Sequence, residues 1–283
     1  MQKFGFLAVF TLFALWGCAA RSTTGVPSRV PPQQRHVVSL MPSLTEDLFA
    51  IGAGPQVVAV DQISAQLPPA RNLPIVGNFS SINTERIIEL HPDIVAGIPS
   101  QDRLLQPLAR AGIAHTLLRD DSFEDIFSDL ERLGALTGHI QRAQVLEEQL
   151  RARTRQLTRS LHFKRVPSVF VVLDTTPIYT AGPRSYISTL IRLAGGRNAA
   201  ENLASAYASY SAEALLRLQP DAIISDPSTH LGAVLANEPW RSLHAVSQHH
   251  VYIVDPAAIL ERPGPRYNEG LAWLIARLAP LAK

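Results

Sequence analysis

The sequence is almost without cysteine. Cys18 is the only cysteine among 283 residues, so an intramolecular disulfide and a thiolate metal site are both excluded. A chain of this length does not depend on such cross-links, because roughly 250 residues can bury a large apolar core. We expect that core to be divided between two lobes.

An excess of charge of one sign is also lacking. The chain has 26 Lys and Arg residues against 24 Asp and Glu residues, a formal net charge of +2. Nucleic acid is therefore not an expected partner, since its binding requires a basic face.

Three catalytic signatures are missing as well. The sequence has no H-E-x-x-H zinc motif, no G-x-S-x-G nucleophile turn and no G-x-x-x-x-G-K-[ST] phosphate loop. The nine histidines show no compact ligand spacing. We therefore expect a protein that is not an enzyme and that has no metal site of its own.

Only one long apolar run is present, from Phe4 to Trp16, and Lys3 precedes it. The run is too short for a mature membrane span, which needs about 20 residues. Its end at Leu-Trp-Gly-Cys predicts a lipoprotein signal peptide over residues 1–17 and a lipid on Cys18. Residues 18–34 are then a flexible, lipid-anchored tether in the periplasm or cell envelope, and the lipid is the only membrane contact. The alternative is an ordinary signal peptide that is cleaved near Ala19 or Ala20.

From His36 onward, short β-branched runs alternate with helical periodicity. Strands are predicted at 37–40, 57–60, 94–96 and 115–118, with helices that begin after Ser43, Asn83 and Ser122 as capping residues. Such alternation is typical of parallel sheets covered by helices.

An internal repeat indicates two similar units. Residues 83–95 (NTERIIELHPDIV) match residues 211–223 (SAEALLRLQPDAI), and 48–54 match 190–196 in the same order. Between the halves, residues 139–160 contain no Pro or Gly and predict a helix about 33 Å long. The predicted fold is α/β, with two similar lobes of mainly parallel sheets joined by one long backbone helix. The predicted bounds are 35–135 for the N-terminal lobe, 136–162 for the helix and 163–283 for the C-terminal lobe.

Several stretches, in their order and spacing, carry a resemblance to a known family. They include VVSLMPSLTEDLFAIG, LPIVGNFSSINTERIIELHPDIVAG and LERPGPRYNEGLAWL. The chain resembles the periplasmic solute-binding proteins with a single helical backbone, which deliver cobalamin, ferric siderophores or haem to ABC importers, and the cobalamin branch is the most similar. The resemblance implies a monomer that binds a metal chelate, has no cofactor of its own and docks on an ABC permease with its ATPase subunits.

The resemblance also implies functional positions. Glu85 and Glu261 match the glutamates that dock on the permease, although Glu85, like Glu213, is also explained as a first-turn helix carboxylate. The expected ligand-binding residues are Phe79, Tyr179, Arg184, Ser185, Ile98, Ile259 and Trp240. For Trp240, packing in the core is the alternative.

Two departures from the family pattern leave the identity of the ligand undecided. Ile98 and Ile259 stand where the cobalamin branch tends to have aromatic residues, and loop 61–67 lacks the Tyr that haem carriers place there. Cobalamin remains the first expectation, and a ferric siderophore or haem is the alternative. An envelope lipoprotein enzyme or a metal-binding adhesin is the alternative from another class.

Overall fold

The computed structural model describes residues 31–119 and 121–283. The predicted signal peptide and Cys18 lie outside the described residues. Within the described part of the chain, no helix combines the length and the apolar composition that a membrane span requires.

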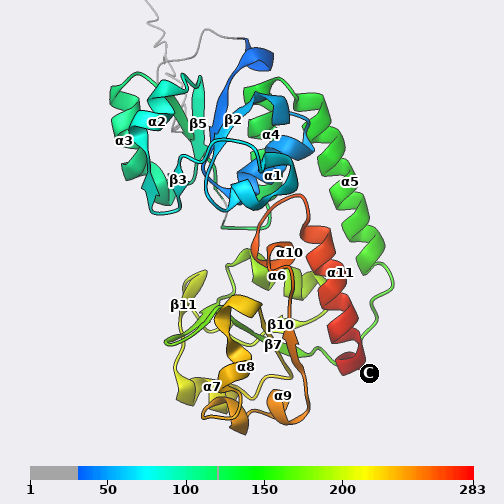
Figure 1. Ribbon diagram of the computed structural model, residues 1–283. Coiled ribbons are helices and arrows are strands. Elements are labelled where there is room, and N and C mark those ends of the chain that lie inside the picture. The colour runs from blue at the N-terminus through cyan, green and yellow to red at the C-terminus, as the bar shows by residue number, and fades with distance from the viewer. Residues whose placement is uncertain (1–30, 120) are drawn as a thin grey trace, which may run out of the picture.

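The N-terminal lobe is built on a parallel four-stranded sheet in the order β2-β1-β5-β6 (Figure 1). Its strands are short and mostly buried, as their continuous Val, Ile and Ala runs predict. The strands are β1 (Val37–Ser39), β2 (Val57–Val60), β5 (Ile94–Gly97) and β6 (Ala114–Leu117). The helices that cover the sheet are α1 (Pro42–Ala50), α2 (Thr84–Glu89) and α3 (Asp102–Arg110).

A small hairpin, β3 (Gly77–Asn78) and β4 (Ser81–Ile82), leaves this sheet after β2. Gly77 has a φ of 150°, and a Cβ at this position would collide with the carbonyl oxygen of Ser81. Glycine therefore allows the chain to reverse tightly, which puts Phe79 at the turn of the hairpin.

The C-terminal lobe repeats the same topology, with a parallel sheet in the order β10-β7-β12-β13. The strands are β7 (Ser168–Val172), β10 (Arg197–Asn198), β12 (Ala222–Ser225) and β13 (Val251–Ile253). An additional antiparallel sheet contains β8 (Asp174–Thr175), β9 (Ile178–Ala181) and β11 (Tyr207–Ser209). The helices of this lobe are α6 (Tyr186–Leu193), α7 (Ala212–Leu218), α8 (Leu231–Val234), α9 (His244–Ser247), α10 (Ala258–Glu261) and α11 (Tyr267–Leu278).

The predicted repeat is confirmed by this topology. In both lobes the second main-sheet strand pairs at the edge beside the first, and the third pairs on the other side. The matched sequences 83–95 and 211–223 form the equivalent units α2–β5 and α7–β12. The two-lobed α/β fold with mainly parallel sheets is therefore correct.

Two helices link the lobes. The first is α4 (Asp125–Thr137), and the second is α5 (Ile140–Thr158), which follows Gly138 in a left-handed conformation. The 19 residues of α5 give a length of about 28 Å, and the helix runs along one side of the molecule from one lobe to the other (Figure 1). It is three residues shorter than the predicted run of 139–160.

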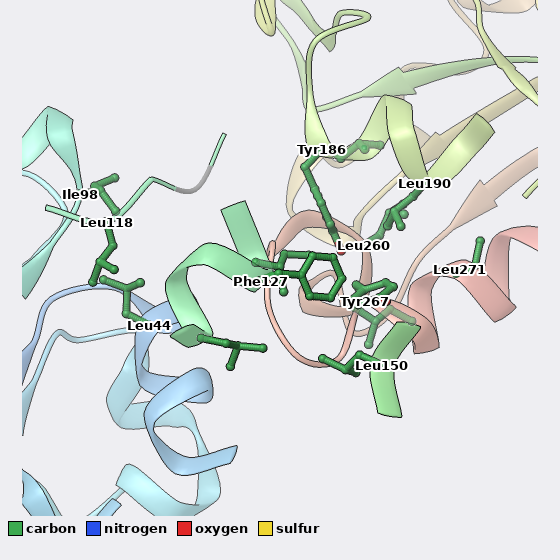
Figure 2. Close-up of a cluster of buried hydrophobic side chains, with 14 of the residues drawn as sticks. Leu44, Ile98, Leu118, Phe127, Leu150, Tyr186, Leu190, Leu260, Tyr267 and Leu271 are labelled. Atoms are coloured by element: carbon green, nitrogen blue, oxygen red, sulfur yellow. The ribbon is translucent and has the colours of Figure 1, made fainter. Parts of the chain in front are cut away.

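One apolar core continues from lobe to lobe. Its members include Leu44 of α1, Leu150 of α5 and Leu271 of α11 (Figure 2). At the junction, the rings of Phe127 and Tyr267 meet edge to face with centroids 6.0 Å apart. This geometry is favourable for aromatic pairs and fixes α4 against α11.

Three local predictions are decided by hydrogen bonds. Asn83 caps α2 as predicted, accepting from the Arg86 amide at 2.9 Å. Ser122 and Asp125 exchange the expected reciprocal bonds, although the helix itself begins at Asp125. Ser43 is not a cap, because α1 already begins at Pro42, whose fixed φ suits the first helical position.

The end of the predicted tether is also corrected. Residues Pro32–Gln34 form a 3-10 turn, and the side chain of Gln56 donates to the Pro32 carbonyl oxygen at 3.0 Å. Arg35 donates to the Leu136 carbonyl at the end of α4 at 3.1 Å. The chain is therefore attached to the N-terminal lobe from Pro32 onward.

Candidate functional site

A cavity of about 480 Å³ lies between the two lobes. Its volume is within the range of about 300–1,000 Å³ that is usual for ligand pockets. The residues that line it come from both halves of the chain: Phe79, Ile98, Pro99, Ser100, Asp121, Tyr207, Glu261 and Pro263. Most of the N-lobe residues follow β3 or β5, at the carboxyl ends of strands, where ligands bind in open α/β sheets.

Aromatic rings face this cavity from opposite lobes. Phe79 is 57% exposed at the turn of the β3–β4 hairpin, although a phenyl ring gains free energy by burial. Tyr207 on β11 lines the other side. Two flat rings in this arrangement can hold a large planar ligand between them.

Tyr207 was missed by the sequence prediction, although a signal was present. Tyr210 packs on Phe170 in the core of the C-terminal lobe, with ring centroids 5.3 Å apart. In an extended strand, side chains three residues apart point to opposite faces, so Tyr207 faces away from that core. The predicted Tyr179 is half-exposed on the neighbouring strand. Because Tyr207 pairs with Ala181 and Ser209 pairs with Tyr179, both tyrosines lie on the same face of the sheet.

Gln101 fixes the N-lobe wall of the cavity. Its buried amide nitrogen lies 3.4 Å from the carbonyl oxygens of both Leu40 and Phe79. Its amide oxygen accepts from the backbone N–H of Ile98 at 3.2 Å. One side chain thus connects the ends of β1, β5 and the hairpin, and it positions Phe79 and Ile98.

A second cavity of about 270 Å³ adjoins the first through shared lining residues, Glu261 and Pro263. Its other lining residues are Met41, Pro42, Ser43, Ala257, Ala258 and Arg262. The hydroxyl of Ser43 is buried without a hydrogen-bond partner among the described residues. A buried hydroxyl usually has a partner, so this cavity can take a polar ligand group.

Glu261, one of the two residues that were predicted to dock on the permease, is of intermediate exposure and lies between the lobes. It ends α10 and lines both cavities between the lobes. Burial, followed by repulsion from Asp226 and a hydrogen bond with it, raises the pKa of Glu261 to about 8, and the neighbouring Arg262 only partly opposes this.

The two lobes are also joined by an ion pair beside the smaller cavity. Arg262 donates from Nη1 to Oε1 of Glu46 on α1 at 2.8 Å. The side chain of Glu46 is 8% exposed and that of Arg262 is 24% exposed. The ion pair therefore connects the two lobes in a largely desolvated environment.

Four other predicted ligand residues lie elsewhere. Trp240 is 3% exposed in the C-lobe core, so the alternative of core packing is correct. Ser185 is a buried helix cap that accepts from the Ser188 amide and donates to the Gly182 carbonyl. Ile259 belongs to the interlobe core, and Arg184 is exposed on the loop before α6; neither lines the two cavities.

Glu85 is exposed in the first turn of α2, as predicted. Glu213 occupies the equivalent position in α7, is also exposed, and follows the capping residue Ser211. The two carboxylates are thus related by the internal repeat.

Within the described ranges, no group of three or more His, Cys, Asp or Glu side chains is arranged to hold a metal ion.

Comparison with known proteins connects this geometry with a family. The model of the family described as "Periplasmic binding protein" matches residues 37–258. An uncharacterized ABC transporter substrate-binding lipoprotein, YvrC of Bacillus subtilis (strain 168), is 28% identical over 89% of this chain and 82% of its own length. A vitamin B12-binding protein of Photorhabdus laumondii is 32% identical over 66% of this chain and 69% of its own.

Solved structures give the same result. The vitamin B12-binding protein BtuF of Vibrio cholerae superposes with a TM-score of 0.76 and 26% identity, over 89% of this chain and 99% of its own. A periplasmic heme-binding protein of Pseudomonas aeruginosa has the same TM-score and 28% identity, over 88% of this chain and 94% of its own. The fold is therefore shared by carriers of different ligands. The chain belongs to the periplasmic binding protein family of ABC transporters.

Proposed function

We propose that this protein captures cobalamin or a related corrinoid between its lobes and delivers it to an ABC permease. The observation that carries the proposal is the cavity with Phe79 on one lobe, Tyr207 on the other and a carboxyl group beside them. A corrin ring offers flat faces to the two aromatic rings and amide-bearing edges to polar groups. The B12-binding relatives support this ligand class.

Haem is the second candidate, and one residue favours it. Tyr207 presents a phenol to the cavity, and a phenolate can ligate haem iron. Loop 61–67, which follows β2, offers no tyrosine, so a haem would depend on Tyr207 or Tyr179. The acidic lining residue Asp121 disfavours haem, because the propionates of haem are anionic.

The remaining parts of the proposal concern delivery. The protein acts as a carrier and not as an enzyme. A lipid on Cys18 attaches it to the cell envelope. Glu85 and Glu213 replace the pair Glu85 and Glu261 as the carboxylates that dock on the permease.

The first test is a ligand titration. Tryptophan fluorescence of the purified protein is followed while cyanocobalamin, haemin or ferrioxamine is added. Cyanocobalamin is expected to bind with a micromolar or lower Kd, and haemin and ferrioxamine more weakly. Tight haemin binding with a tyrosinate-type absorption spectrum would favour the second candidate. Binding of none of the three would contradict the proposed ligand class.

Substitutions test whether the aromatic rings carry the affinity. Phe79→Ala and Tyr207→Ala are each expected to raise the Kd about 10- to 30-fold, on the order of 1.5–2 kcal/mol, because each removes one stacking face. Val145→Ala is the control, since Val145 is exposed on α5 and does not line the two cavities. Equal affinity of all three variants and the wild type would show that the ligand binds elsewhere.

A further inference from the structure

A third cavity, of about 360 Å³, lies in the C-terminal lobe, beside α9 at the end of this lobe that is farther from the N-terminal lobe (Figure 1). It lies at the opposite end of β12 from the interlobe cavities: Asp221, which lines it, directly precedes β12, whereas Asp226, the hydrogen-bond partner of Glu261, directly follows this strand. The proposed carrier function therefore makes no use of this cavity, which we call the amino-end cavity. Its polar lining residues are Arg165, Asp221, His244, Gln248 and His250.

The internal repeat shows that the fold does not require a polar side chain at this place. Gly112 and Ile113 precede β6 in the same way as His249 and His250 precede β13, and the first residue of each pair has a positive φ, 80° and 58°. The second residue of each pair donates its backbone N–H to a carbonyl oxygen five positions earlier. Isoleucine is thus sufficient for this turn, so the imidazole of His250 is available for another role.

The carboxylate of Asp221 holds Arg165 at the cavity. Its Oδ2 accepts from the backbone N–H and the hydroxyl of Ser168 at 2.7 and 2.8 Å, and its Oδ1 accepts from Nη2 of Arg165. Burial alone would raise the pKa of Asp221, but these hydrogen bonds together lower it, so the group is an anion at neutral pH. Within the described residues, Asp221 is the one acceptor of the Arg165 guanidinium group, and the side chain of Arg165 is 59% exposed. The other N–H groups of this guanidinium are therefore available to a ligand.

The orientation of the His250 ring is fixed by the backbone. Its Nδ1 lies 3.1 Å from the carbonyl oxygen of Asp221. A carbonyl oxygen only accepts, so Nδ1 carries a hydrogen and Nε2 is the ring nitrogen that remains for the cavity. Nε2 can accept from the P–O–H group of a phosphate monoanion, and it donates to a dianion when the ring is protonated. The imidazole of His250 thus suits either charge form of a phosphate group.

The other two polar lining residues come from one side of α9. His244 is the first residue of this helix and Gln248 directly follows its last residue, so the two exposed side chains, four positions apart, lie on the same face. Asp221 is the one acid among the lining residues, and Arg165 balances its charge. The exposed Lys164 precedes Arg165 in the chain. The charge around the cavity therefore favours an anionic ligand.

We propose that the amino-end cavity binds the phosphate group of a small organic phosphate monoester. Its donors come from three places: the segment before β7, the turn before β13 and α9. Donors from several directions suit the tetrahedral arrangement of phosphate oxygens. A flat carboxylate is bound best by two parallel N–H groups of one arginine, and Asp221 already occupies part of the Arg165 guanidinium. The remaining lining residues are apolar and offer a wall to the organic part of the ligand: Ala245, Pro280 and Leu281.

The experiment is calorimetric titration of the purified protein with glycerol 3-phosphate at pH 7. The wild type is expected to bind with a submillimolar Kd. Arg165→Gln is expected to raise the Kd at least tenfold, because it removes a charged donor and leaves Asp221 without its cation. His250→Ile copies Ile113 of the N-terminal lobe and is expected to raise the Kd about three- to tenfold, since one contact is lost. Arg110→Gln is the control, because Arg110 is exposed at the end of α3 and does not line the cavity.

Two further probes separate the ligand classes. Inorganic phosphate is expected to bind more weakly than glycerol 3-phosphate, since it has no organic part for the apolar wall. Glycerophosphoglycerol, the soluble headgroup of an anionic lipid, is also expected to bind more weakly, because a diester has no terminal phosphate group. Tighter binding of this diester overturns the assignment to a monoester.

The fold and the interlobe cavities are checked in the same variants. Circular dichroism and the cyanocobalamin Kd of Arg165→Gln and His250→Ile are expected to match the wild type, so a weaker phosphate contact is not mistaken for unfolding. If Arg165→Gln does not fold, His250→Ile alone decides, since its replacement is the residue of the equivalent turn. No binding of glycerol 3-phosphate by the wild type at millimolar concentration overturns the proposal. Equal affinity of the wild type and a folded His250→Ile variant also overturns it.

Discussion

At the scale of single residues, the core of the N-terminal lobe contains a buried aspartic acid whose ionised form is disfavoured. Asp47 on α1 is 1% exposed, and it faces the buried Asp129 of α4. Burial, followed by the charges of Asp129 and Glu46, raises the pKa of Asp47 well above its ordinary value. The folded state therefore holds a proton that the unfolded chain releases at about pH 4.

The sign of the resulting pH dependence follows from linkage. This contribution to stability is fully present below pH 4 and is lost as the pH rises toward the folded-state pKa, by about 1.4 kcal/mol per pH unit. Asp47→Asn keeps the shape of the side chain but cannot ionise. We expect this variant to lose the pH dependence of the free energy of unfolding, which urea unfolding at pH 5, 7 and 9 measures. Glu148→Gln, on the exposed side of α5, is the control and should follow the wild type. Parallel curves for Asp47→Asn and the wild type would contradict the assignment.

Some residues of the site can be predicted from their neighbours in the sequence, whereas others depend on distant segments. The placement of Phe79 at the cavity agrees with its polar neighbours Asn78 and Ser80, because an apolar ring in a polar turn has no core to join. The raised pKa of Glu261 was not predictable, because it depends on desolvation between the lobes and on Asp226, which lies 35 positions earlier in the chain. The same holds for Trp240, since the cluster that covers it is assembled from distant segments.

At the scale of elements, the repeated units could be predicted well. Strand runs such as Val57–Val60 and the cap at Asn83 depend on neighbours within a few residues, and both are found as expected. The start of α1 was placed two residues too late, because Ser43 has the chemistry of a cap whereas Pro42 already fixes the first helical φ. Local competition of this kind is decided by packing, which buries Ser43.

The equivalent helices α2 and α7 lead to a prediction about delivery. Each presents an exposed first-turn carboxylate, Glu85 or Glu213, and anions are favourable there because the helix dipole supports them. Glu85→Ala with Glu213→Ala is expected to leave the ligand Kd unchanged and to reduce uptake by cells at least tenfold, since charge pairs set orientation and association rate. Glu148→Ala is the matched control. Normal uptake by the double variant would contradict docking through these helices.

At the scale of the whole molecule, the lobes are coupled by a shared core and by one ion pair. The core joins α4, α5 and α11 (Figure 2). It also includes Val37 of β1 and Val169 of β7, so it reaches both main sheets. Sequence alone predicts the long helix but not this continuity, because Phe127 and Tyr267 come from separate halves. A continuous core resists large relative movement of the lobes, so the cavities between them are largely preformed.

Arg262→Ala measures how much the ion pair adds to this coupling. The change leaves the carboxylate of Glu46, whose side chain is 8% exposed, without its cation. We therefore expect the free energy of unfolding to fall by about 1–3 kcal/mol, a loss between those of exposed and buried ion pairs. Urea unfolding gives this loss, and small-angle scattering should show a larger radius if the lobes also separate. Arg86→Ala is the control, because its pair with Glu89 is exposed and local, and its loss should stay below about 0.5 kcal/mol. If Arg262→Ala matches this control, the shared core alone holds the lobes, and the pair acts only on the chemistry of the cleft.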